Sequence, residues 1–176
     1  MIKKLFIFFL FFLFYKNIFA TEIRIIDLNH LINSNNQFIN FISIIEKDQI
    51  VHKDNFSKQE NILKERIENI EELKLILSSD EIDKEINKYN TDLKIFNDKI
   101  KKFNFHYENQ INNFKNILMK HILDLLKDYS NENKIDLILD ANSYIIATNA
   151  INITEVIYNK LDKIKLNKEF EKYKQD

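Results

Sequence analysis

Apolar residues in the middle of the chain recur with the spacing of a coiled coil. From Ile82 to Tyr107 they stand alternately four and three residues apart without a missed position, which predicts one helix with a continuous apolar seam. An earlier stretch, from Phe56 to Leu77, repeats at intervals of seven, and two charged residues interrupt it. The predicted seam residues are Leu63, Ile67, Ile70, Ile82, Ile86, Tyr89, Leu93, Phe96, Ile100 and Phe103.

Ser78-Ser79-Asp80 separates the two stretches and predicts a turn between two helices. Ser78 and Glu81 have the spacing of a capping box, which starts a helix without Gly or Pro. A short connection makes the helices antiparallel neighbours, so we expect a hairpin with its tip at 78–80 and a length of about 60 Å. The alternative is one continuous helix in a long intermolecular coiled coil.

Both ends of this hairpin, called the arm below, are marked in the sequence. Ser34 and Gln37 form a second capping-box pair, which predicts a helix start near Asn35. After Tyr107 the apolar residues follow each other at spacings of four, a stutter at which a left-handed supercoil relaxes. We expect the arm to join the rest of the protein near this point and to occupy residues 35–129.

Short segments rich in β-branched residues flank the arm on both sides. Residues 22–28 and 134–140 alternate between apolar and polar side chains, and each predicts a strand. After a turn at 141–143, residues 144–147 are a further predicted strand, and Thr154 is a candidate N-cap for a helix at 155–164. Strands from both chain ends most simply pair in one small sheet.

The predicted fold class is therefore α+β, mostly α, with a long antiparallel coiled-coil hairpin inserted in a small β-sheet body. The predicted parts are the body at 21–34 and 130–165, the arm at 35–129, and a charged tail at 166–176 that frays. Glycine and proline are absent, so tight turns with positive φ are expected to fall to Asn, Asp or Ser.

The first twenty residues predict export from the cytoplasm. Two lysines precede an apolar run that ends before Lys16, and Ala20 supplies the small residue of a signal-peptide cleavage site. An uncleaved membrane anchor is the alternative, although the apolar run is short for a span. Without the three lysines of this segment, the 26 basic residues fall to 23 against 27 acidic residues, a net charge of −4. This balance argues against a nucleic-acid partner.

The sequence predicts no catalytic, metal or cofactor site. His30, His52, His106 and His121 show no ligand spacing with acidic residues, and the lack of Gly and Cys excludes phosphate loops and thiol chemistry. Asp136 and Asp140 would lie roughly 13 Å apart along a strand, too far for a paired-carboxylate mechanism. We expect them to be a solvated strand edge and a turn cap.

The aromatic residues of the arm divide into two groups. Phe96, Phe103 and Tyr107 lie on the seam, so we expect them to pack in the core between the helices. Phe105 lies off the seam between Asn104 and His106 and is the candidate for an exposed contact with a binding partner.

Three stretches resemble the OmpH/Skp family of periplasmic chaperones. They are the signal peptide leading into Ile23–Leu28, the coiled-coil hairpin, and the segment from Ile135 to Asn142 with Tyr144 and Asn152–Ile157 following. The resemblance covers roughly residues 22–165. It implies a homotrimer with a β-sheet body and three helical arms enclosing a cavity, which binds unfolded outer-membrane proteins in the periplasm without ATP. The body residues expected at the trimer interface, from their alternation, are Ile23, Ile25, Leu137, Leu139 and Ile145.

The chain also departs from the resemblance. Well-known family members are strongly basic, whereas this mature chain is weakly acidic, so capture of acidic clients by positive charge is not implied. No basic cluster supports a lipopolysaccharide site, and peripheral membrane contact stays open. The alternatives are a structural coiled-coil protein of the envelope without clients and, if Ala20 stays uncut, a membrane-anchored tether.

Overall fold

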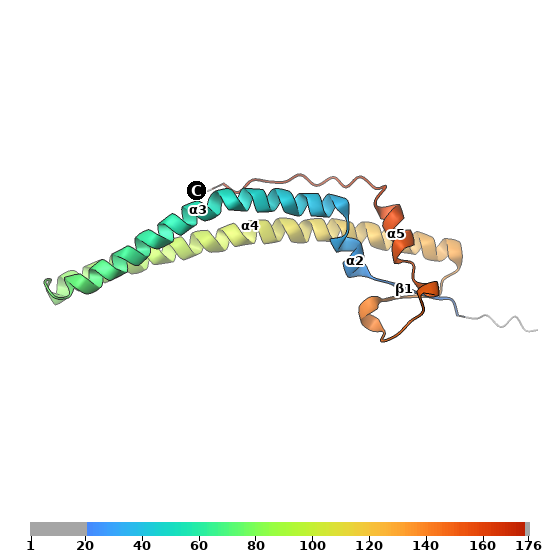
Figure 1. Ribbon diagram of the computed structural model, residues 1–176, viewed down its shortest axis with the longest axis horizontal. Helices are drawn as coiled ribbons and strands as arrows, with labels where there is room; N and C mark the ends of the chain where they lie inside the picture. The colour runs from blue at the N-terminus through green and yellow to red at the C-terminus, as the bar shows by residue number, and fades with distance from the viewer. Residues whose placement is uncertain (1–20, 175–176) are drawn as a thin grey trace, which may run out of the picture.

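The protein is a long helical hairpin attached at one end to a small body (Figure 1). The computed structural model describes residues 21–174, and the predicted signal peptide lies outside this range. The helical hairpin, the short strands on either side of it and the mostly helical α+β class agree with the sequence-based prediction.

Helices α3 (Asn36–Leu73) and α4 (Ser79–Asn133) form the hairpin and lie side by side and antiparallel (Figure 1). The 38 residues of α3 extend about 57 Å. The Ser78–Glu81 pair is confirmed, because the Glu81 carboxylate accepts hydrogen bonds from the Ser78 N–H at 3.0 Å and the Ser78 hydroxyl at 2.7 Å. Ser78 is extended (ψ 158°) and starts α4, so the turn occupies residues 74–78 and lies earlier than the predicted tip. The alternative of one continuous helix is excluded.

The start of α3 differs by one residue from the prediction. Asn35 is the N-cap, and its side-chain oxygen accepts a hydrogen bond from Phe38 N–H at 3.0 Å. Ser34 instead ends a preceding short helix, α2 (Leu28–Asn33). Gln37 makes no capping box, because its side-chain amide is bonded to the backbone of Ile164 and Leu166 at 2.8 and 2.9 Å.

The seam of α4 continues past Tyr107 through a polar residue. Gln110, Phe114, Leu118, Ile122 and Leu126 are its buried residues after Tyr107. Gln110 stands three residues after Tyr107 and keeps the coiled-coil spacing, and the spacings of four begin only after it. The stutter therefore lies at Phe114, which packs against Phe38 and Phe41 with ring centroids 5.5 and 4.8 Å apart, where the first turns of α3 begin.

The body joins the two ends of the chain through a two-stranded parallel sheet. Strand β1 (Ile23–Ile26) pairs with β2 (Leu137–Asp140), and the whole hairpin is the crossover between them. Two aspartates fix this pairing: Asp136 accepts a hydrogen bond from Glu22 N–H at 2.8 Å, and Asp140 accepts one from Leu28 N–H at 3.1 Å. These carboxylates therefore hold the other chain end in place, a role that the sequence did not predict. The turn cap predicted at this position is also present, because Asp140 accepts a hydrogen bond from Asn142 N–H.

The prediction of a strand at 144–147 is wrong. A hairpin turn after β2 needs residues with positive φ, and Lys134 is the one residue with positive φ within 21–174. The chain instead leaves β2 through a 3₁₀ helix, η1 (Ala141–Ser143), which Asp140 caps through Asn142 N–H. Residues 144–148 are irregular, and a second 3₁₀ helix, η2 (Asn149–Ile151), follows.

Helix α5 (Thr154–Leu161) closes the body against α2 and α4. Thr154 was expected as its N-cap, but Ile153 holds that position. The Thr154 hydroxyl is buried and accepts a hydrogen bond from Asp27 N–H at 2.9 Å, so it links α5 to the N-terminal strand. The N–H of Ile153 donates to the Ile25 carbonyl at 2.9 Å on the free side of β1.

The prediction of a frayed tail is wrong for residues 167–174. This segment has no regular secondary structure, and it runs back along the hairpin as an extended strap (dark red in Figure 1). Phe170 packs against Phe41 with ring centroids 6.3 Å apart, and Glu171 is hydrogen-bonded to Gln110. The tail is rich in charged residues, and packing of the apolar Phe170 ring against the arm favours its docking.

Candidate functional site

The seam residues predicted from the sequence lie between α3 and α4. Ile70, Ile82, Phe96 and Phe103 are buried, and the remaining six are half-buried. The aromatic side chains of the seam pack edge to face: Phe56 lies 5.0 Å from Phe103 and 6.3 Å from Phe96 between ring centroids. The seam is thus occupied by contacts between the two helices.

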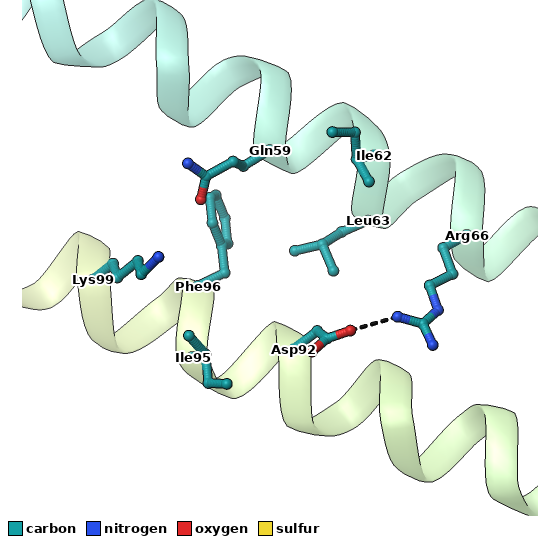
Figure 2. A pocket seen from close by; sticks show the side chains of 8 residues that line it. All are labelled: Gln59, Ile62, Leu63, Arg66, Asp92, Ile95, Phe96 and Lys99. Carbon is teal, nitrogen blue, oxygen red and sulfur yellow. Dashed lines mark hydrogen bonds and ion pairs between the residues drawn. The ribbon is translucent and has the colours of Figure 1, made fainter. Parts of the chain in front are cut away.

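A groove of about 240 Å³ opens on one side of the seam in the outer half of the arm (Figure 2). Figure 2 shows Leu63 and Phe96 pointing into the space between the helices, while Arg66 reaches across from α3 to Asp92 on α4. The rest of the lining combines exposed apolar and polar side chains: Gln59, Ile62, Ile95 and Lys99. Such a lining offers weak apolar contacts beside charges of both signs.

Charged residues connect the helices beside this groove. The Arg66 guanidinium contacts the carboxylates of Asp92 and, at 3.4 Å, of Glu85. The hydrogen bond from Lys88 is the main cause that holds the pKa of Glu85 below its ordinary value, and Arg66 adds to it. Exposed pairs of this kind contribute little to stability, so the network mainly sets the register of the two helices.

A second groove, of about 660 Å³, lies beside the strap formed by residues 167–174. Its arm side is lined by Lys102, Phe105, His106 and Asn109, and its other side by Glu171 to Lys174. Phe105 was predicted as an exposed contact, and 68% of its surface is exposed here.

The strap is held by an aromatic cluster that the sequence pattern did not predict. The Tyr173 ring lies 5.2 Å from His52, 5.2 Å from Phe103 and 5.5 Å from His106, between centroids. Tyr107 adds a fourth ring at 6.3 Å. The sequence signal for this cluster was a polar residue, Gln110, at a seam position, together with two aromatic residues in a charged tail.

A hydrogen-bonded pair of a buried phenol, Tyr107, and a half-buried carboxylate, Asp48, lies under the strap. The Tyr107 hydroxyl donates to Asp48 at 2.6 Å, and the same carboxylate oxygen accepts from Tyr173 N–H at 3.2 Å. Burial raises the pKa of the Tyr107 phenol, and its hydrogen bond to Asp48 raises it further. Tyr107 therefore stays protonated and acts as a donor that fixes Asp48 for the strap.

The five residues predicted for an oligomer interface are split between the surface and the core. Ile25 is buried against the body, Leu139 is half-buried, and Ile23, Leu137 and Ile145 are exposed. Ile145 is fully exposed (103%), and its neighbour Ile146 nearly so. The outer edge of β2 has no partner strand in the described part of the chain. The described part of the body therefore leaves both apolar side chains and a sheet edge uncovered.

The four histidines do not form a ligand set. His30 lies 3.7 Å from Glu155, and His52 and His106 pack against aromatic rings. Among residues 21–174 no cluster of three or more potential metal ligands is present. Over the same residues, the helices lack a segment of the length and apolarity needed to cross a membrane.

These features define a body-and-arm protein that presents grooves and exposed apolar side chains. A solved structure with the same architecture is that of an OmpH-like outer membrane chaperone from Caulobacter crescentus CB15. The match covers 89% of this chain and 93% of that chain, with a TM-score of 0.64 and 11% sequence identity. Searches against family models and curated proteins found no match. The resemblance inferred from the sequence is thus confirmed at the level of the fold.

Proposed function

We propose that the mature chain is an ATP-independent periplasmic holdase that keeps unfolded outer-membrane proteins soluble between its arms. The observation that carries the proposal is the OmpH-like fold, joined to an arm that exposes large apolar residues among mixed charges. These residues occur on both helices and at the tip: Ile50, Val51, Ile62, Leu75, Ile76, Ile95 and Phe105.

Scattered apolar contacts suit a client that must be released later. Each exposed side chain contributes a small area, and the interspersed charges keep the free arm soluble. Leu75 is 90% exposed and belongs to the turn at 74–78, and this turn lies at the end of the arm away from the body (Figure 1). Because the mature chain is weakly acidic, the proposed capture relies on these apolar contacts more than on long-range attraction.

The proposed assembly is a homotrimer formed by the body. Ile145, Ile146 and Leu137 expose apolar side chains on the body, and the outer edge of β2 has no partner strand among the described residues. Exposed apolar side chains beside an open sheet edge are typical of an interface, because another chain can pair with the edge and cover them. A trimer would place three arms around one central space, which agrees with a client held between them.

Two variants separate assembly from client binding. Ile145→Asp combined with Ile146→Asp should convert the trimer into monomers in light scattering, since a charge would be buried at the interface. Ile62→Asp lies on the arm and should leave the trimer intact while weakening suppression of aggregation of an unfolded β-barrel protein.

The wild-type chain is the reference in both assays. A wild-type trimer that leaves aggregation of the β-barrel protein unchanged would refute the chaperone proposal. A wild-type monomer would refute the proposed assembly.

A further inference from the structure

The strap lies in the groove that α3 and α4 form beneath it. Two kinds of contact hold it there. Its aromatic side chains, Phe170 and Tyr173, pack on rings of the arm, with Tyr173 enclosed by His52, Phe103 and His106. Its backbone at Glu171 and Tyr173 is hydrogen-bonded to side chains of both helices.

The backbone contacts do not depend on the identity of the residue between the rings. The Gln110 side-chain amide donates to the Glu171 carbonyl at 2.9 Å and accepts from the Glu171 N–H at 2.9 Å. Asp48 accepts from the N–H of Tyr173 at 3.2 Å. Any extended chain offers the same N–H and C=O groups, so only the aromatic positions discriminate between segments.

Gln110 also shows that this groove is built for an occupant. It is 4% exposed and stands at a seam position where an apolar residue would pack between the helices. A buried amide is costly unless it is hydrogen-bonded, and the Glu171 backbone supplies one donor and one acceptor. The amide nitrogen also lies 2.9 Å from His106 Nε2, so without the strap it is the amide oxygen that would need another extended chain or water.

Space remains beside the strap for further contacts. The groove of about 660 Å³ runs along residues 171–174 and includes the exposed ring of Phe105. An incoming chain could touch Phe105 first and then replace the strap.

From these contacts we infer that the groove is a binding site for extended segments of unfolded polypeptides carrying two aromatic residues three positions apart, and that the chain's own residues 167–174 are its resident competitor. This inference rests on the proposed holdase function. A tethered segment competes at an effective concentration in the millimolar range, so only clients that present several such segments displace it. Outer-membrane barrels carry girdles of aromatic residues at their membrane interfaces, so their unfolded chains are a source of aromatic residues for this groove.

The test uses full-length mature protein in three forms. The double variant Phe170→Ser/Tyr173→Ser releases the strap. The control Lys165→Ser/Glu169→Ser changes two exposed residues that precede the aromatic pair and leaves the net charge unchanged. The probe is a fluorescent synthetic peptide with the sequence of residues 165–176, and its binding is followed by anisotropy.

The released variant should bind the peptide at least tenfold more tightly than the wild type or the control variant. A peptide with Ser in place of both aromatic residues should not bind. Equal binding by all three proteins, or no binding by the released variant, would overturn the inference.

A second measurement connects the groove to clients. The released variant should suppress aggregation of an unfolded β-barrel protein at a several-fold lower concentration than the wild type. If all three proteins suppress aggregation equally, the groove is not a client site, while the proposed holdase function stands. If none suppresses aggregation but the peptide binds as expected, the proposed function fails and the groove remains a peptide site.

Discussion

Replacing Tyr107 by phenylalanine removes one hydroxyl group and keeps the ring that packs in the seam. The ring is 1% exposed and its hydroxyl donates to Asp48 at 2.6 Å. Hydrogen bonds to charged groups contribute about 1.5–3 kcal/mol. Asp48 is half-buried, so water can replace part of the lost bond and the lower end of this range applies.

We therefore expect Tyr107→Phe to lower the free energy of unfolding by about 1.5 kcal/mol, a shift of roughly 3–6 °C in Tm. The measurement is urea unfolding followed by far-UV circular dichroism at one fixed protein concentration, because an oligomer's stability depends on concentration. The m-value should not change, since the same surface is exposed on unfolding.

Tyr89→Phe is the matched control. Tyr89 is a half-buried seam tyrosine whose hydroxyl makes no side-chain hydrogen bond within residues 21–174, so its substitution should change stability by less than about 0.5 kcal/mol. Equal effects of the two substitutions would show that the Tyr107–Asp48 bond contributes nothing. The proposed role of the Tyr107–Asp48 bond in holding the strap would then be refuted as well, because Asp48 would need no fixed orientation.

Three further predictions concern stability. Lys134 adopts a left-handed conformation (φ 54°, ψ 42°) at the end of α4. Lys134→Gly should therefore stabilise the protein by about 0.5–1 kcal/mol in urea unfolding, whereas Lys134→Ala should not. A glycine variant that is less stable than the wild type would contradict this. Burial acts to raise the pKa of Asp140, but hydrogen bonds from Leu28 and Asn142 outweigh it and hold the pKa below its ordinary value of 3.8. This stabilisation is present above about pH 3.8 and is lost as the pH falls through the folded-state pKa, so Asp140→Asn should cost stability at pH 7 and progressively less as the pH falls below 3.8; a pH-independent difference would refute it. Asn35→Ala should lower the free energy of unfolding by about 1 kcal/mol, because the N-cap is lost. Asn35→Ser should lower it less, because serine keeps an acceptor and removes a buried amide nitrogen that has no partner. A serine variant that unfolds at a lower temperature than the alanine variant would contradict the assignment.

The arm could be predicted because its information is local. A seam spacing of four and three is repeated many times within α4, and the Ser78–Glu81 capping box needs only a three-residue separation. Strands β1 and β2 were also recognised, although each is shorter than predicted, because pairing rather than alternation decides where a strand ends. Residues 144–147 were also predicted as a strand, but they have no partner strand in the described part of the chain and therefore form no strand.

The strap could not be predicted, because its contacts join residues far apart in the sequence. Glu171 meets Gln110 across 61 positions, and Tyr173 meets Asp48 across 125. A charged tail has the composition of a fraying terminus, and only the packed helices create the rings and the buried amide that hold it. The oligomer candidates illustrate a second limit: alternation marked both Ile25 and Ile145, and only the folded body buries the first and exposes the second.

The sequence alone determined that two helices return upon each other and that short strands stand at both ends, because periodicity and caps act within a few residues. The tertiary structure decided which strands pair, where the turn falls, and that the last residues fill the groove of the arm. Those outcomes depend on the free energy of burying side chains and backbone groups against surfaces that exist only after folding.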